Sequence, residues 1–392
     1  MQAGSLGTVS GVHASVLLDR SASFLEEVYS PELALYPFST TVDGDRYDND
    51  YGSRALRYTI NSLLGLQEAA RAGGRPDEAA VAARVDEFLE RRLGDITTPA
   101  DLGLLLVLLR HRPGHPAATA AIEQLARDVG NGLGSRLPIQ TLSWMQWGLD
   151  ASAAAGSRTA ARIADRLFAL IDEEYVHEGT LLPRHSSELY RRNVVSFGAI
   201  VYFLRAVYEH ARRTGDTRAR AIFRSGVEHM LAAQGPQGEW PWLYAVATGR
   251  PAELYPVYAV HQDSMAMLFL LPALDEGIPG VRAAIERSLA WAFGANELGR
   301  PMYVDGPFRA FRSITRTDRF PRAGRYVRAV RGIAFGRPAK SARGKGVRVN
   351  EECRSYHPGW ILYAWSSRPE LFVDLAGRPA AAEPRPALAV AR

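Results

Sequence analysis

Segments of helical length with regularly spaced apolar residues follow one another along most of this 392-residue chain. Apolar residues at every third or fourth position predict amphipathic helices, and glycine, proline or polar breaks separate the segments. Their recurrence in pairs predicts antiparallel helix hairpins. The predicted pairs are 53–72 with 77–93, 100–112 with 116–131, 139–155 with 158–175, 191–214 with 217–233, 261–275 with 279–293, and 355–365 with the N-terminal helix 10–29.

The two members of a pair differ in their patterns. Segments 139–155 and 191–214 are apolar or aromatic on most sides, as expected of helices that are covered on both faces, whereas 77–93 and 158–175 have a one-sided apolar stripe. The repeat lengths vary more than in an open helical solenoid. We therefore predict an all-α fold, an (α/α)6 toroid with concentric inner and outer helices.

Three longer connections, 33–52, 234–260 and 296–354, interrupt the hairpins, and each leads to the start of a predicted inner helix. Long connections in a compact domain are often functional. The predicted organisation is one toroid domain over residues 1–375, with 296–354 as a basic irregular insertion. Residues 376–392, rich in Ala, Pro and Arg, are predicted to be a disordered tail.

Positive charge is concentrated in the last of these connections. The chain has a formal net charge of +5, and residues 309–354 hold fourteen Arg or Lys against three acidic residues. Arginine suits a phosphate or carboxylate, so this segment predicts an anionic ligand, with a solvated basic loop as the alternative. Nucleic acid is not expected, because no binding motif accompanies the charge.

The sequence also bears on location. No apolar stretch approaches the roughly 20 residues that cross a bilayer, and the first residues lack the pattern of a secretory signal. The single cysteine, Cys353, excludes an internal disulfide. These features predict a cytoplasmic protein without a transmembrane segment.

A short motif supports the toroid. The residues from Gln234 to Trp240 read Gln-Gly-Pro-Gln-Gly-Glu-Trp, which resembles the Gln-x-x-x-Gly-x-Trp pattern of terpenoid cyclases and prenyltransferases, a group of α/α toroids. The resemblance implies that Gln234, Gly238 and Trp240 tie adjacent helices together. The Asp-x-Asp-Asp motif of these cyclases is not present, and His261-Gln262-Asp263 stands in the corresponding place.

This last segment is the first candidate for a catalytic site. The resemblance places Asp263 at the position of the cyclase acid, and His261 and Tyr258 lie close by in the sequence. A pocket carboxyl whose proton is managed by a histidine suits acid–base catalysis. The alternative is that Asp263 caps the helix by accepting hydrogen bonds from backbone N–H groups.

Substrate-binding candidates are aromatic and cationic residues near the inferred mouth of the ring. Aromatic rings suit either sugar stacking or a carbocation, and arginines at a helix start favour an anion. These candidates are Trp144, Trp147, Trp242, Tyr190, Arg191, Arg192, Asn193, Tyr255, Tyr356 and His357. No cofactor is predicted. The acidic cluster of Asp43, Asp45 and Asp48 is the one candidate for a divalent cation, with a solvated acidic turn as the alternative.

Three functions remain open at this point. The main expectation is a terpenoid cyclase-like enzyme. Its substrate would be a prenyl chain, with or without a diphosphate, and its reaction would begin with protonation of that chain. The alternative is a carbohydrate-active toroid, a lyase, epimerase or hydrolase that acts on an acidic or lipid-linked glycan. A toroid that binds a ligand without catalysis is the third. In all three cases the expected partner is an anionic ligand, either a small molecule or a lipid-linked one.

Overall fold

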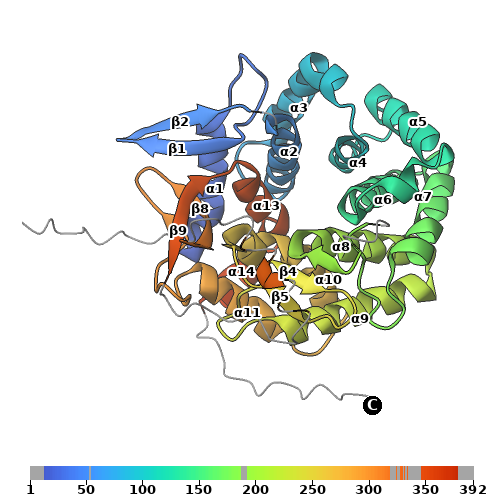
Figure 1. Ribbon diagram of the computed structural model, residues 1–392. Coiled ribbons are helices and arrows are strands. Elements are labelled where there is room, and N and C mark those ends of the chain that lie inside the picture. Colours follow the sequence, from blue (N-terminus) through green and yellow to red (C-terminus); the bar gives the residue numbers. More distant parts are fainter. Residues whose placement is uncertain are drawn as a thin grey trace, which may run out of the picture.

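The protein is an α/α toroid in which an inner ring of helices is surrounded by an outer ring (Figure 1). The structure is a computed structural model that describes residues 13–52, 54–186, 192–317, 324, 327–329, 331, 333 and 346–377. In this part of the chain the inner ring consists of α2 (Ala55–Arg71), α4 (Pro99–Leu108), α6 (Ile139–Ala154), α8 (Phe197–Thr214), the π-helical turn η4 (His261–Met265) with α10 (Met267–Asp275), and α13 (Tyr356–Trp365). The outer helices are α1 (Ala14–Val28), α3 (Glu78–Arg92), α5 (Pro116–Gly130), α7 (Arg158–Leu170), α9 (Thr217–Ala233), α11 (Val281–Ala292) and α14 (Pro369–Ala376).

The ring is closed by its ends. The last inner helix, α13, packs against the first, α2, and the N-terminal α1 covers α13 from outside. The predicted toroid is therefore confirmed, and an open superhelix is excluded. The tail predicted from residue 376 begins at the end of α14, and the residues from 378 onward lie outside the described part.

Side-chain caps fix where several helices begin. The first turns of α3, α4, α7, α8 and α9 are capped by the side chains of Asp77, Thr98, Ser157, Ser196 and Asp216, which accept hydrogen bonds from backbone N–H groups. Most predicted segments match these helices closely. The segment 191–214 does not, because residues 194–196 form a strand and the helix starts only after the Ser196 cap. Arg192 and Asn193 thus precede a strand instead of opening an inner helix.

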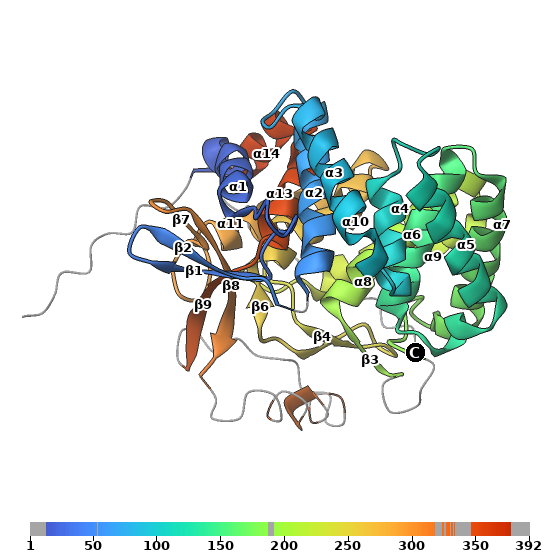
Figure 2. The same cartoon turned by 90° about the horizontal axis from the view of Figure 1, so that it is seen from above.

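Two small antiparallel sheets lie at one end of the helical ring (Figure 2). The larger joins β2 (Arg46–Asp50), β1 (Ser39–Asp43), β9 (Val347–Cys353), β8 (Arg309–Arg316) and β6 (Val257–Tyr258), with β7 (Tyr303–Val304) beside β8. The smaller joins β3 (Val194–Ser196), β4 (Leu243–Ala245) and β5 (Pro251–Glu253). The connections 33–52, 234–260 and 296–354, expected to be irregular, therefore contribute strands.

The strands have a consistent place in the chain. β2, β3, β6 and β9 each precede an inner helical segment within a few residues, namely α2, α8, η4 and α13. The sheets consequently gather around the N-terminal ends of the inner ring. They form a platform at the end where the helix dipoles are positive.

Glycines let the inner helices approach closely. A Cβ atom placed on Gly148 of α6 would lie 2.2 Å from the carbonyl oxygen of Gly103 in α4. One placed on Gly65 of α2 would lie 2.0 Å from the carbonyl oxygen of Gly359 in α13. Any side chain at these two crossings would push the inner helices apart.

The motif at residues 234–240 ties the outer layer to the inner one. The side-chain amide of Gln234 donates to the carbonyl oxygens of Gly238 and Ala284, and the indole N–H of Trp240 donates to Ser288 Oγ at 2.8 Å. Ser288 in turn donates to the carbonyl oxygen of Gln262 in η4. These bonds join α9, α11 and η4, as the structural interpretation of the motif requires.

Aromatic side chains fill the centre of the ring. Trp147 of α6 and Trp360 of α13 stack with centroids 6.3 Å apart, and Tyr363 lies edge-on to both. Trp147 is buried, so this predicted substrate-binding residue belongs to the packed centre. The centre separates a pocket at the start of the inner helices from another at their end.

Candidate functional site

A cavity of ≈ 240 Å³ lies at the end of the ring where the inner helices begin. Its lining comes from the first turns of α2, α6, α8 and α13, from η4, and from the β4, β6 and β8 regions. The lining residues are Arg54, Arg57, Tyr58, Asn61, Gln140, Trp144, Ser196, Gly198, Tyr202, Trp242, Tyr258, His261, Met265, Arg312 and Tyr356. This set is called the central pocket below.

Arg57 projects from the first turn of α2. Its Nε lies 2.5 Å from Asp101 Oδ1, and its guanidinium carbon is 4.9 Å from the ring centroid of Trp144. Asp101 comes from the start of α4 and is not part of the lining. The carboxylate holds the guanidinium from behind, so that the remaining N–H groups are available to a ligand.

Arg312 occupies another wall of the pocket, on β8. It forms an ion pair with Glu352 of β9, and its guanidinium carbon lies 5.5 Å from the ring centroid of Tyr258. Arg354 holds the same Glu352 from the other side at 2.5 Å. Arg312 is thus fixed in the same manner as Arg57, by a carboxylate outside the lining.

The pocket is therefore positive. Arg54, exposed at the entry to α2, is the third arginine of the lining, and the described lining includes no Asp or Glu. The N-terminal ends of four inner helical segments point to the same space and add to the positive potential. An anion is the ligand that this charge favours.

Several arginines of the basic segment 309–354 belong to the described part of the chain, and among these Arg312 lines the central pocket. Arg316 and Arg328 instead form ion pairs with Glu253, at 3.6 Å and 2.7 Å. Most of the residues between 318 and 345 lie outside the described part. Within the described residues, the charge excess of this segment reaches the central pocket through Arg312.

His261 lies in an aromatic enclosure at the wall of the pocket. Its imidazole is parallel to the indole of Trp242, with centroids 5.9 Å apart, and Phe197 and Tyr258 lie 4.7 Å and 5.0 Å away. Burial, and next the nearby His357, lower the pKa of His261 to about 3. The ring is therefore neutral at pH 7. Its Nδ1 is buried and has no hydrogen-bond partner among the described residues.

Several polar atoms of the lining have no partner. Besides His261 Nδ1, the buried Asn61 Oδ1, Trp144 Nε1 and Arg312 Nε form no hydrogen bond within the described structure. An unsatisfied buried polar group costs about 1–3 kcal/mol. These four atoms are buried in the free protein, and similar unpaired atoms occur elsewhere in the described structure, such as Tyr244 Oη.

Tyrosines complete the lining opposite His261. Tyr356 of α13 packs against Tyr58 of α2 with centroids 4.5 Å apart. Burial, and then the neighbouring Tyr58, raise the pKa of Tyr356 well above its usual value. Tyr356 is consequently a protonated phenol that can donate a proton or a hydrogen bond.

Asp263 lies behind the wall of the pocket and is not part of its lining. Its Oδ2 accepts a hydrogen bond from the Tyr303 hydroxyl at 2.5 Å and lies 2.6 Å from His357 Nε2. The helix-capping interpretation does not apply, because no backbone N–H donates to this carboxylate. His357, another predicted substrate-binding residue, is buried with it.

The remaining predicted residues fall into three groups. Trp144, Trp242, Tyr258 and Tyr356 line the central pocket with His261. Tyr255 is buried outside it, 4.7 Å below the guanidinium of Arg316, and Arg192 and Asn193 precede β3. Tyr190 and Arg191 lie outside the described residues.

The sequence analysis missed the lining residues Arg57, Asn61, Gln140, Tyr202 and Arg312. Asn61 offers a signal in retrospect, because it is a polar residue within an apolar segment of α2 and is 3% exposed. Arg312 lies in the basic segment 309–354, but nothing in the sequence singles it out among the fourteen basic residues there, and Arg57, Gln140 and Tyr202 carry no signal of their own. Only the arrangement of the ring brings them together.

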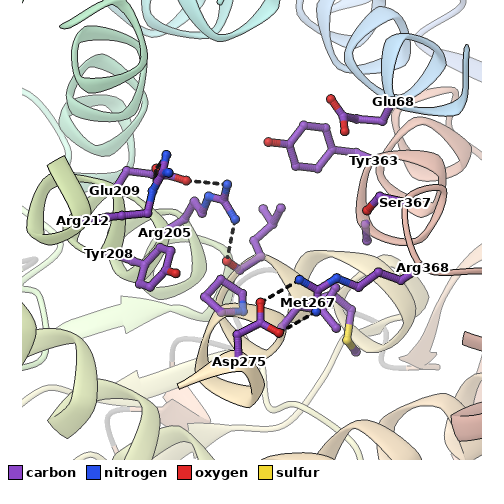
Figure 3. Close-up of a pocket in the computed structure, with 14 residues that line it drawn as sticks. Glu68, Arg205, Tyr208, Glu209, Arg212, Met267, Asp275, Tyr363, Ser367 and Arg368 are labelled. Carbon is purple, nitrogen blue, oxygen red and sulfur yellow. Dashed lines mark hydrogen bonds and ion pairs between the residues drawn. The ribbon is translucent and has the colours of Figure 1, made fainter. Parts of the chain in front are cut away.

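A second cavity, of ≈ 340 Å³, lies at the other end of the inner helices (Figure 3). Its charged side chains are already paired with one another. Arg205 and Glu209 form an ion pair at 2.6 Å, and Arg368 binds both carboxylate oxygens of Asp275 at 2.7 Å. This pairing leaves no net charge for a ligand, so the central pocket is the better candidate.

The predicted cation site is not supported. Asp43, Asp45 and Asp48 belong to the β1–β2 hairpin, in which Asp43 is opposite Arg46 and Asp48 is opposite Thr41. Across the described ranges, no group of three or more His, Cys, Asp or Glu side chains could hold a metal ion. Within the same ranges, no helix has the length and hydropathy needed to span a bilayer.

The sequence matches no protein-family model and no curated protein. Solved structures do resemble the fold. A glycosyl hydrolase of family 88 from Bacteroides vulgatus has a TM-score of 0.54 and 10% identity, covering 92% of this chain and 100% of its own. The unsaturated glucuronyl hydrolase from Streptococcus agalactiae has a TM-score of 0.54 and 14% identity, covering 94% and 92%.

A polysaccharide lyase also resembles the chain, with a TM-score of 0.54, 11% identity and coverage of 91% and 97%. A variant of the Streptococcus agalactiae hydrolase was solved with the ligand dGlcA-GalNAc6S. At these identities the likeness establishes the fold, an α/α toroid of the kind seen in glucuronyl hydrolases.

The expectation of a terpenoid cyclase-like enzyme is wrong. The structures that resemble this toroid are glucuronyl hydrolases and a polysaccharide lyase. The lining of the central pocket agrees with this correction. It includes three arginines and several tyrosines, whereas a prenyl chain requires an apolar cavity. The Gln-x-x-x-Gly-x-Trp motif is a feature of helix packing in this chain and carries no information about the substrate.

Proposed function

We propose that the protein is a carbohydrate-active enzyme that binds a uronate sugar in the central pocket and moves a proton at the carbon next to the carboxylate. The observation that carries this proposal is the combination in one cavity of three arginines, a neutral buried histidine and tyrosines, without a carboxylate in the described lining. The arginines suit an acidic sugar, and the histidine and tyrosines suit proton transfer.

Arg57 and Arg312 would hold the sugar carboxylate. Each already has a carboxylate partner behind it, which fixes the guanidinium while leaving donors for a ligand. Charge-assisted bonds to the carboxylate also stabilise the extra electron density that forms when the adjacent C–H bond breaks. The aromatic rings of Trp144 and Trp242 offer faces on which a sugar ring can stack.

His261 is the proposed base. Its neutral imidazole, part of the pocket lining, accepts the proton from the carbon next to the carboxylate, and the electron pair of that C–H bond forms a carbon–carbon double bond. The bond from the neighbouring carbon to the glycosidic oxygen breaks, and Tyr356 protonates the departing oxygen. Tyr258, which lies 5.0 Å from His261, is the second candidate for the base. The negative sugar would raise the pKa of His261 towards the value that a base requires.

The size of the cavity favours one sugar at a time. At ≈ 240 Å³ it lies below the range of about 300–1,000 Å³ that is usual for small-molecule sites. A uronate at the reducing end of an oligosaccharide, whose O4 carries the remaining sugars as the leaving group, fits this volume better than the middle of a polymer.

Hydrolysis of a uronate is the second candidate, because the solved structures with this fold include unsaturated glucuronyl hydrolases. Glycoside hydrolases commonly use Asp or Glu as the proton donor. The carboxylates next to the lining lie outside it: Asp101 and Glu352 are paired with Arg57 and Arg312, and Asp263 lies behind the wall of the pocket. Proton abstraction by His261 is therefore the function we favour.

The test is product analysis with oligosaccharides that carry a 4-O-substituted uronate at the reducing end, in deuterium oxide, read by mass spectrometry and NMR. The proposal predicts either a new double bond or deuterium at the carbon next to the carboxylate. The His261→Gln variant should give neither the double bond nor the deuterium at that carbon. Cleavage that adds water, with no double bond and no deuterium at that carbon, would establish the hydrolase instead.

A further inference from the structure

The carboxylate of Asp263 joins three separate elements behind the central pocket. Its Oδ2 is 2.5 Å from the hydroxyl of Tyr303 and 2.6 Å from Nε2 of His357. Asp263 belongs to η4, Tyr303 to β7 and His357 to α13. The carboxylate side chain is 1% exposed, so these contacts are shielded from water.

Each of the three elements also leads to a residue of the pocket lining. His261 lies two positions before Asp263 in η4, and Tyr356 directly precedes His357 in α13. Tyr303 is paired with Ala310 across β7 and β8, and β8 carries Arg312. One buried oxygen therefore connects the backbone segments that hold the proposed base, the proposed acid and an anion-binding arginine.

Stability alone does not account for this arrangement. The second oxygen of the carboxylate, Oδ1, is buried and has no hydrogen-bond partner, which is costly in an apolar environment. The backbone at Asp263 is a π-helical turn, a wider and rarer form that is frequent at functional sites. The backbone carbonyl of Asp263 is held as well, by the indole N–H of Trp365 at 2.6 Å.

We propose that Asp263 is a positioning residue, whose carboxylate sets the relative placement of His261, Tyr356 and Arg312 through its bonds to Tyr303 and His357. This inference rests on the proposed function for the roles of those three residues. Asp263 itself does not touch the substrate, so it acts through the geometry of the pocket.

The chemistry of the two bonds explains why a carboxylate is required. Burial, and then the charge of Asp263, raise the pKa of Tyr303 well above its usual value, so its hydroxyl remains protonated and donates. A carboxylate oxygen accepts the two donors together, whereas the neutral oxygen of an amide binds each of them more weakly. Asp263→Asn should loosen both connections while keeping the shape of the side chain.

The chain offers a matched control in Asp150 of α6. Its carboxylate is also 1% exposed, accepts hydrogen bonds from Gln146 at 2.8 Å and Arg213 at 2.6 Å, and lies 3.3 Å from His210. It is a buried carboxylate beside a histidine, but it does not line the central pocket or contact its residues. Asp150→Asn therefore controls for the loss of a buried charge.

The first experiment measures the environment of His261 in the free protein by NMR. The imidazole carbon–hydrogen NMR signals of the full chain are recorded, and the His261 signal is assigned by its loss in His261→Gln. Asp263→Asn and Tyr303→Phe should shift or broaden the His261 signal, and Asp150→Asn should leave it in place. An unaltered His261 signal in folded Asp263→Asn or Tyr303→Phe would overturn the inference.

Kinetics with a uronate substrate supply the second readout. Asp263→Asn should lower kcat about 10²-fold and change KM much less, because misplacement of the reacting groups by about 1 Å costs this much. His357→Gln, which keeps an N–H donor, should retain more activity than His357→Leu. Equal activity of these two His357 variants would contradict the inference. If the wild type shows no uronate activity, the proposed function fails, and the NMR comparison still decides the positioning role.

Discussion

The indole of Trp242 and the imidazole of His261 are stacked, with ring centroids 5.9 Å apart and an angle of 7° between their planes. The stack buries a histidine against an aromatic face at the edge of a positively charged cavity. Burial of His261, to which this contact contributes, lowers the pKa of its imidazole, and the effect can be measured.

The first prediction concerns the pH dependence of stability. The pKa of His261 is about 3 in the folded protein, against 6.5 for an exposed histidine. Between these values the unfolded chain binds a proton that the folded protein does not, so the free energy of unfolding decreases as the pH falls from 6.5 towards 3. Relative to His261→Gln, the wild type should lose about 3 kcal/mol between pH 7 and pH 4.5.

Urea unfolding of both proteins across this pH range measures the difference. His13→Gln, which removes an exposed histidine before α1, is the control and should follow the wild type. Parallel curves for His261→Gln and the wild type would show that His261 is not held neutral by burial.

A second prediction separates the two tyrosines of α13. Tyr356→Phe keeps the packing against Tyr58 but removes the proton of the proposed acid. Turnover of a uronate substrate should fall about 10²-fold or more, with little change in the melting temperature. Tyr363→Phe changes the same helix at the opposite cavity and should retain wild-type turnover. Equal rates for the two variants would remove Tyr356 from the mechanism.

The third prediction tests the close packing of the inner ring. Gly148→Ala places a methyl group 2.2 Å from the carbonyl oxygen of Gly103, which forces α4 and α6 apart. The free energy of unfolding should fall by about 1–3 kcal/mol. Gly130→Ala at the end of α5 meets no atom within 4 Å and should be neutral or slightly stabilising. Denaturant unfolding followed by circular dichroism compares them, and an equal midpoint for the two variants would contradict the close approach.

The helical ring could be predicted because its signal is local. Apolar spacing and capping residues lie within each segment, so 217–233 and 139–155 reappear as α9 and α6 with little change. The sheets could not be predicted in this way. Their strands are two to eight residues long, and β1 pairs with β9 about 300 positions later, so no single stretch of sequence carries the pairing.

The residues of the central pocket could be predicted only in part. Trp144, Trp242 and Tyr356 were proposed because aromatic residues cluster near the predicted inner helices. His261 and Tyr258 were proposed because they stand close to Asp263, the position of the cyclase acid. All five line the central pocket. Asp263 and His357 were expected at the pocket and instead contact each other behind it. η4 is a π-helical turn, which is wider than an α-helix, so its side chains point in other directions than an α-helical period predicts. The sequence therefore could not show which side chain of η4 faces the cavity.

Calorimetric titration of the protein with glucuronate and with glucose tests the central claim most directly, since the two sugars differ in the carboxylate that the arginines would bind. Glucuronate should bind and glucose should bind at least tenfold more weakly, as expected for a charge-assisted contact of about 1.5–3 kcal/mol. Arg312→Gln should remove most of the preference, whereas Arg348→Gln, an exposed arginine on the adjacent strand, should leave it intact. Equal affinity for the two sugars, or a preference that survives Arg312→Gln, would contradict the account.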